Sequence, residues 1–196
     1  MKEMQQIRSI IQASIDAKAK MLSNQTLLNV LEASVDTVSN CLASGGKVLL
    51  CGNGGSAADA QHLAAELAGR FYLDRPPLFV EALHVNTSSL TAVSNDYGYK
   101  ESFRRLVQAK GKKNDVLIGL STSGNSPNVV LAMQAAKELG MHTIGLTGAK
   151  AAKMDTLSDH LLKAEATDTA RIQECHILLG HILCQLVEAR LFGDKA

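Results

Sequence analysis

The chain has 196 residues, of which 46% are hydrophobic and 20% are charged, a length and balance that predict a single domain over residues 1–196 with a sizeable core. Twenty Lys and Arg nearly balance nineteen Asp and Glu, so the formal net charge is only +1 and provides no long-range field for a polyanion. Aromatic residues make up 4% of the chain and Trp is absent, which disfavours base stacking. We therefore expect neither nucleic acid nor membrane as a partner.

The start of the chain, MKEMQQIRSIIQAS, lacks the continuous apolar stretch of a signal peptide, and no later run of apolar residues approaches the roughly 18 that a spanning helix needs. A cytoplasmic location is expected. The four cysteines form no CxxC pair and lie among apolar residues, as small buried thiols do. We expect neither disulfides nor a cysteine zinc site.

Helical spacing of apolar residues predicts two helices at the start of the chain, over 7–21 and 25–42, the second ending before Gly45 and Gly46. Five short apolar segments follow, and they alternate with helical segments in the way that indicates a parallel sheet. The predicted strands are 47–51, 78–83, 115–120, 142–146 and 159–164. A long helix over 170–191 ends the pattern, so the predicted fold class is α/β.

A loop rich in hydroxyl groups, STSGNS at 121–126, follows the third predicted strand and opens a helix. Free N–H groups at a helix start bind anions, Gly124 permits a close approach of the backbone, and the hydroxyls add donors. A phosphate monoester fits this loop. The loop has no P-loop lysine, which disfavours a nucleoside triphosphate. The alternative is a polar turn in which Asn125 or Ser126 only caps the helix.

The loop after the first predicted strand, CGNGGS at 51–56, is built in a similar way with three glycines. Such glycines allow close contact with a ligand, although a tight strand-to-helix turn needs them as well. Both loops follow strands at their carboxyl ends, where ligands bind in open parallel sheets. We therefore expect the two loops to face one pocket.

His62 and Glu66 are four residues apart in the next predicted helix, and Gln173 and His181 share a broad face of the last one. Together these four side chains suit acid–base chemistry or a zinc ion. The alternative for the first two is an ordinary pair on a helix surface. Sequence alone places Asn95 and Asp96 in a loop. No companion residue at useful spacing marks the other histidines, His84, His142, His160 and His176, as functional.

Taken together, CGNGGSAADAQHLAAEL, SNDYGY, LSTSGNSPNVVLA and TARIQECHILLGH resemble bacterial phosphoheptose isomerases of the sugar isomerase (SIS) family, over nearly the whole chain. The resemblance implies a flavodoxin-like, three-layer α/β/α fold with a five-stranded parallel sheet, N-terminal helices and a long C-terminal helix. It also implies a homotetramer, in which residues 1–44 serve oligomerisation and residues 45–196 form the core and terminal helix. The implied reaction converts sedoheptulose 7-phosphate to D-glycero-D-manno-heptose 7-phosphate, for lipopolysaccharide synthesis. The resemblance also implies one zinc site per subunit, at the subunit junction.

The resemblance also implies roles for single residues. It assigns the substrate phosphate to Ser121, Thr122, Ser123 and Ser126, and other substrate contacts to Asn53, Gly54, Gly55, Ser56, Glu66, Asn95, Asp96 and Gln173. It assigns zinc to His62, Glu66, Gln173 and His181, with Glu66 and His181 as the acid–base pair. A nitrogen of His181 that binds metal cannot also act as a base, so either the ligands rearrange or the metal mainly polarises oxygens.

One position departs from the family pattern. Some relatives have Asp-Arg-Ile-Gln where this chain has Ala170 followed by Arg-Ile-Gln, so the role of that Asp is vacant here or is taken by Asp168 or Thr169. A competing function is that of a non-catalytic relative that binds the replication initiator with the same fold. That relative lacks the residues corresponding to Glu66 and His181, which favours an enzyme. A sugar-phosphate sensor is a third alternative, but such regulators usually carry a DNA-binding segment.

Overall fold

The computed structural model describes residues 2–193 and shows an α/β architecture preceded by two helices, α1 (Lys2–Ser23) and α2 (Gln25–Ala43). The strands are β1 (Val48–Cys51), β2 (Val80–Ala82), β3 (Val116–Leu120), β4 (His142–Thr147) and β5 (His160–Lys163). The helices between and after them are α3 (Gly55–Ala68), α4 (Thr87–Tyr97), α5 (Ser102–Lys110), α6 (Pro127–Glu138) and α7 (Thr169–Phe192). The five predicted strands and the predicted terminal helix are thus confirmed to within a few residues at each end.

All five strands are parallel and lie in the order β2-β1-β3-β4-β5. The chain moves outward from β1 to β2 and then returns to β3 on the other side of β1. The strand order therefore reverses at β1 and β3, and the crevice between their carboxyl ends is where such sheets bind ligands. The predicted parallel sheet is confirmed, and its switch point lies between the two polar loops.

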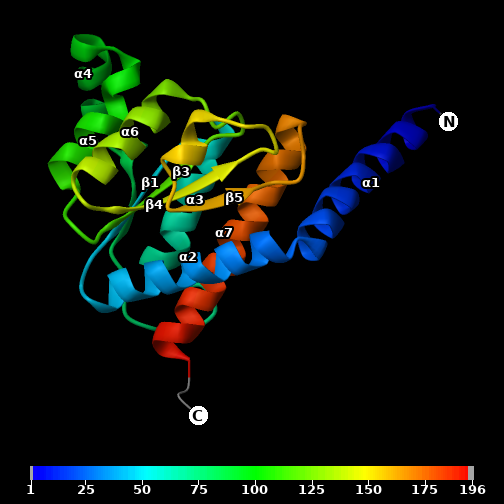
Figure 1. Ribbon diagram of the computed structural model, residues 1–196, viewed down its shortest axis with the longest axis horizontal. Coiled ribbons are helices and arrows are strands. Elements are labelled where there is room, and N and C mark those ends of the chain that lie inside the picture. The colour runs from blue at the N-terminus through cyan, green and yellow to red at the C-terminus, as the bar shows by residue number, and fades with distance from the viewer. Residues whose placement is uncertain (1, 194–196) are drawn as a thin grey trace.

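Alternating side chains of the sheet supply two separate cores, which makes a three-layer molecule (Figure 1). On β1, Val48 and Leu50 face the layer formed by α2, α3 and α7, whereas Leu49 and Cys51 face the layer of α5 and α6. The strands are short apolar runs without alternation because both faces of the sheet are covered. All four cysteines are buried and free, as expected.

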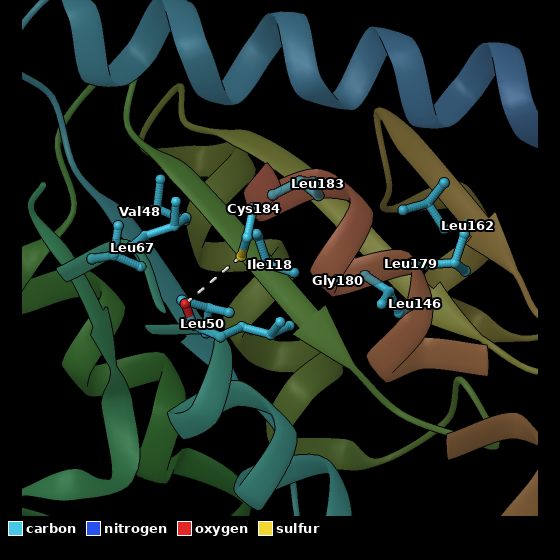
Figure 2. A pocket seen from close by; sticks show the side chains of 12 residues that line it. Val48, Leu50, Leu67, Ile118, Leu146, Leu162, Leu179, Gly180, Leu183 and Cys184 are labelled. Carbon is cyan, nitrogen blue, oxygen red and sulfur yellow. Dashed lines mark hydrogen bonds between the residues drawn. The ribbon is translucent and has the colours of Figure 1, made fainter. Parts of the chain in front are cut away.

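Figure 2 shows the interior where α3 and α7 pack on the sheet. Apolar side chains from all five strands meet Leu179, Leu183 and Cys184 of α7, and the Cys184 thiol lies 3.9 Å from the carbonyl oxygen of Leu63. The space left between them is about 10 Å³, at the lower limit for one water molecule, and its lining is apolar. This interior is packed core, so a polar ligand must bind elsewhere.

The terminal helix α7 is long and apolar enough to cross a membrane, judged by length and composition alone. However, 44% of its most apolar stretch is buried inside the protein. Its buried residues, Leu179 and Val187 among them, belong to the core shared with α2, α3 and the sheet. The apolar character of α7 is therefore accounted for by packing in the core.

The expectation that Asn95 and Asp96 lie in a loop is wrong, because both fall in the last turn of α4. The side chain of Asn86 caps the start of this helix by accepting from the Ser89 N–H, and Gly98, at φ 83°, ends it. Helix α4 has no fully buried residue, so it lacks the periodic apolar pattern that reveals other helices.

Candidate active site

Direct hydrogen bonds join the two polar loops. The backbone of Cys51 at the end of β1 is in register with Gly119 of β3, which brings the following loops together. The amide of Asn53 and the amide of Asn128, in the first turn of α6, donate to each other over 2.8 Å in both directions. These bonds tie the first loop to the start of the helix that the second loop opens, so the two loops lie close together at the carboxyl edge of the sheet.

The hydroxyl groups of the STSGNS loop converge on one point. The Oγ of Ser121 lies 2.9 Å from the Oγ of Ser126 and 3.4 Å from that of Ser123. Ser126 is the N-cap of α6, but its side chain makes no capping hydrogen bond. Its hydroxyl thus remains on the ligand side of the helix start, where it can donate to an anion.

Contacts with the segment after β4 fix the shape of this loop. Gly124 has φ +63°, and a Cβ there would overlap Ala152, so the position requires glycine. The amide N–H of Met154 donates to the Gly124 carbonyl, and the N–H of Lys153 donates to the Asn125 side chain over 2.9 Å. Beside the loop lies a hollow of about 250 Å³, lined by Thr122, Ser123, Asn125, Gly148, Ala149, Lys150, Ala151, Ala166, Thr167, Thr169 and Ile172.

His62 and Glu66 on α3 meet His181 on α7. The two Nε2 atoms lie 2.8 Å apart, and the Glu66 carboxylate lies 3.4 Å from Nε2 of His62. One potential ligand atom from each of the three residues lies within 4.8 Å of the others. His62 is solvent-exposed and the other two are partly buried, so a ligand can enter. Two imidazoles and a carboxylate are a ligand set that suits zinc.

Gly180 allows the two helices to approach closely enough for this cluster. A Cβ at Gly180 would overlap the side chain of Leu63. Leu63 directly follows His62, and Gly180 directly precedes His181, so this contact lies next to both histidines. The glycine in an otherwise regular helix therefore has a packing reason, and it places the two histidines opposite each other.

Asp59 lies one turn before His62 and was missed by the sequence analysis. Burial raises the pKa of its carboxyl group above the usual range, although the nearby His62 and His181 oppose this rise. Its spacing of three residues from His62 and seven from Glu66 is the signal that could have revealed it, because all three share a face of α3.

A buried ion pair fixes the end of α3 that carries Glu66. Arg75 and Glu188 are in contact at 2.9 Å, and both side chains are 2% exposed. Arg75 also donates to the backbone carbonyl of Glu66 over 3.1 Å. Burial favours a higher pKa for Glu188, but N–H donors of three backbone amides and Arg75 outweigh it and lower that pKa. This network holds the Glu66 backbone in place.

Gln173 lies beside the first loop. Its side-chain amide packs against Gly55, where a Cβ would overlap it. Gln173 precedes His181 by eight residues, about 12 Å along the helix. The close pairs Gly55 with Gln173 and Leu63 with Gly180 show that α3 and α7 run side by side in the same direction.

Asp168 and Thr169 precede Ala170, the position where some relatives have Asp, and their side chains make different contacts. Asp168 is the N-cap of α7, and its side chain accepts from the Arg171 N–H. Thr169 lines the hollow beside Thr122 and Ser123. Of the two, Thr169 is therefore the residue at the pocket.

Asn95 and Asp96 are exposed, and their side chains bond to each other over 2.9 Å. The α4 segment nevertheless reaches the site, because the hydroxyl of Tyr99 donates to the Asn53 side chain over 2.8 Å. Tyr99 and Asn128 were both missed by the sequence analysis. Their spacing from Asn53 along the chain carries no signal, since only the fold brings them together.

The comparisons with known proteins agree with this architecture. A model of the SIS domain matches residues 12–148, and the chain belongs to this family. Within it, the chain is 49% identical over 189 residues to a phosphoheptose isomerase of Aneurinibacillus thermoaerophilus, with 96% of each protein covered. It is 50% identical over 189 residues to a phosphoheptose isomerase of Clostridium acetobutylicum, again with 96% of each covered.

A solved structure supports the same relationship. The phosphoheptose isomerase of Neisseria gonorrhoeae superposes with a TM-score of 0.89 at 42% identity, and the match covers 95% of this chain and 98% of that one. The similarity therefore includes both the N-terminal helices and α7.

Proposed function

We propose that the protein is a phosphoheptose isomerase that converts sedoheptulose 7-phosphate to D-glycero-D-manno-heptose 7-phosphate. The observation that carries this proposal is the meeting of Glu66 with His62 and His181 within 4.8 Å. The curated relatives with this name match nearly the full chain, which supports the same activity.

The phosphate binds the hydroxyls of Ser121, Thr122, Ser123 and Ser126 and the free N–H groups at the start of α6. The clustered Oγ atoms of Ser121, Ser123 and Ser126 support this assignment, because a phosphate accepts several hydrogen bonds at once. Asn53, Gly54, Gly55, Ser56, Asn95, Asp96 and Gln173 contact the sugar in this proposal. The position of Gln173 against Gly55 supports its place among them.

His62, Glu66 and His181 would hold a zinc ion. Their nitrogen and oxygen atoms are a fitting donor set. The two Nε2 atoms lie within hydrogen-bond distance, 2.8 Å, so the one that donates would lose its proton when both bind the ion. Bound there, zinc would polarise substrate oxygens as a Lewis acid. Gln173 was expected as a fourth ligand, but it lies against Gly55 and about 12 Å along α7 from His181, so within one chain we propose it as a substrate contact only.

The reaction moves one proton between adjacent carbons and one between their oxygens. In our proposal Glu66 removes the proton from the carbon beside the carbonyl, which gives an enediol, and returns it to the neighbouring carbon. His181 serves the oxygens when its Nε2 is free of metal, whereas bound zinc would instead polarise them. Each acid–base role typically contributes 10²–10⁴-fold. The backbone contact from Arg75 to Glu66 holds the base steady during both transfers.

Turnover of sedoheptulose 7-phosphate by the purified protein tests this function. The product is resolved by chromatography, with added zinc, without it, and after chelation. We expect heptose 7-phosphate to form and chelation to lower its rate. Full activity after chelation would show that Nε2 of His181 acts as an acid–base group without metal. Absence of turnover under all three conditions would contradict the proposed function.

Substitution Glu66→Gln tests the proposed role of the Glu66 carboxylate as the base. The amide keeps the size of the side chain but cannot take a proton, so we expect kcat to fall by roughly 10²-fold or more with an unchanged Tm. Near-normal turnover by this variant would remove Glu66 from its assigned role.

The comparisons do not favour the alternative of a non-catalytic protein that binds the replication initiator. The presence of both Glu66 and His181 in one cluster favours the enzyme, because a binding module needs neither side chain.

We also propose that residues 1–196 form one domain located in the cytoplasm, and that residues 1–44 join four copies into a tetramer.

A further inference from the structure

The side chain of Asn53 is held by two neighbours that belong to different elements. Asn128 of α6 both donates to it and accepts from it over 2.8 Å. The hydroxyl of Tyr99, which follows α4, donates to Asn53 Oδ1, also over 2.8 Å. Asn53 therefore lies at the meeting point of the first loop, the start of α6 and the α4 segment.

The backbone of α6 determines which way these amides point. The N–H of Val129 donates to Oδ1 of Asn128 over 3.1 Å, and a peptide N–H can only donate. The atom of Asn128 that faces it must therefore be the oxygen. Asn128 is 2% exposed, so it has no water with which to exchange these bonds. Its Nδ2 then faces Oδ1 of Asn53, and the reciprocal pair fixes the Asn53 amide in turn.

This arrangement limits what Asn53 can offer to a ligand. A carboxamide oxygen has two lone pairs, and a carboxamide nitrogen has two N–H groups. Asn128 and Tyr99 occupy both lone pairs of Asn53 Oδ1, whereas Asn128 takes only one N–H of Nδ2. One N–H donor of Asn53 remains.

We propose that Asn128 and Tyr99 are positioning residues that fix the Asn53 amide so that it presents an N–H donor, and not its carbonyl, to an oxygen of the phosphosugar. The inference rests on the proposed function for its ligand. It adds that Asn53 prefers a hydrogen-bond acceptor as the substrate atom that it contacts. Tyr99, after α4, and Asn128, in α6, together determine this preference.

Substitution Tyr99→Phe tests the first positioning contact. It removes one hydroxyl at a side chain that is 52% exposed, so the fold should persist with an unchanged Tm. The Asn53 amide is then held by Asn128 alone and is less firmly oriented, so we expect KM to rise about 5-fold while kcat stays within twofold. Tyr97→Phe is the matched control, because Tyr97 is also 52% exposed and its ring instead packs on Arg105. This control should leave both constants unchanged.

Substitution Asn128→Asp tests the second contact with a readout that a purely structural role would not move. The ionised carboxylate can still accept from Val129 and Asn53, but it cannot donate to Asn53 Oδ1. Protonation restores a donor of nearly the same shape. We therefore expect KM, relative to the wild type at the same pH, to be raised roughly tenfold at pH 8 and to return toward the wild-type value as the pH falls to 5.

Affinity is measured in parallel as the rise in Tm that sedoheptulose 7-phosphate causes, since ligand binding stabilises the folded state. An inactive wild type whose Tm still rises with the sugar would overturn the proposed function alone, and the variants would then be compared by this rise. A KM ratio for Asn128→Asp that is independent of pH, or a Tyr99→Phe variant that matches the wild type in KM and Tm rise, would overturn the positioning roles.

Discussion

At the scale of single residues, Ser126 departs from the side-chain geometry of an ordinary helix cap. A serine at this position usually caps the helix through its side chain, yet here its hydroxyl lies 2.9 Å from that of Ser121 and makes no capping bond. Sequence alone left both interpretations open, because they share the residue type and the position. The orientation of this hydroxyl, which depends on the packing of the loop, favours the proposed phosphate site over the cap.

We expect Ser126→Ala to raise KM roughly tenfold, the effect of losing a hydrogen bond to a charged group, and to change the free energy of unfolding by less than about 0.5 kcal/mol. Enzyme kinetics and denaturant titration check both values. Asn24→Ala is the matched control, since Asn24 does cap α2 through its side chain. That control should cost about 1 kcal/mol of stability and leave KM unchanged. A Ser126→Ala variant that behaves like the Asn24 control would identify the loop as a capped turn.

At the scale of elements, the sequence predicted the strands and most helices because their apolar runs are short, buried and bounded by polar loops. It failed at α4, whose stability comes from the Asn86 cap and from its contacts with α5 and with the turn that contains Tyr99, and not from a buried stripe. The sequence also predicted that the two loops share a pocket, because parallel strands end at one edge. It could not predict the bond from Asn53 to Asn128, which depends on side-chain packing.

The contact between α3 and α7 gives a prediction at the same scale. Because a Cβ at Gly180 overlaps Leu63, Gly180→Ala should push the helices apart and misplace His181 relative to His62. Overpacking typically costs 1–3 kcal/mol, partly offset by the better helix propensity of Ala. We expect kcat/KM to fall roughly tenfold or more and zinc affinity, measured by calorimetry, to weaken.

The double variant Gly180→Ala with Leu63→Val serves as the rescue, because valine lacks the overlapping terminal methyl groups. It should recover part of the lost activity and zinc affinity. If Gly180→Ala alone binds zinc and turns over substrate as the wild type does, close approach of the two helices is not required for the site.

At the scale of the whole molecule, α1 stands out from the α/β body (Figure 1). Only Ala17 and Met21 of its 22 residues are buried. An isolated helix of this kind is only marginally stable in water, so it needs a packing partner. Met4, Ile7, Ile11, Ile15 and Leu22 are each at least half exposed. They fall within an arc of about 80° around the helix, which makes one continuous apolar stripe.

The proposed tetramer gives this stripe a partner, since burying each such side chain contributes about 1.5–3 kcal/mol. We expect sedimentation velocity to show an oligomer for the wild type and smaller species for the double variant Ile7→Glu with Ile11→Glu. The variant should also have a lower Tm. In addition, the wild-type Tm should rise with protein concentration, because association stabilises the folded chain.

Ser9→Glu is the control for added charge, because Ser9 lies on the opposite face of α1 and is exposed. It should remain fully assembled. A double variant that sediments like the wild type would show that the stripe on α1 is not the contact between copies, and a monomeric wild type would remove the tetramer itself. Zinc affinity of the dissociated variant, measured by calorimetry, adds a further distinction. If His62, Glu66 and His181 of one chain hold the ion, zinc binding should survive dissociation, whereas a site at the subunit junction should lose it.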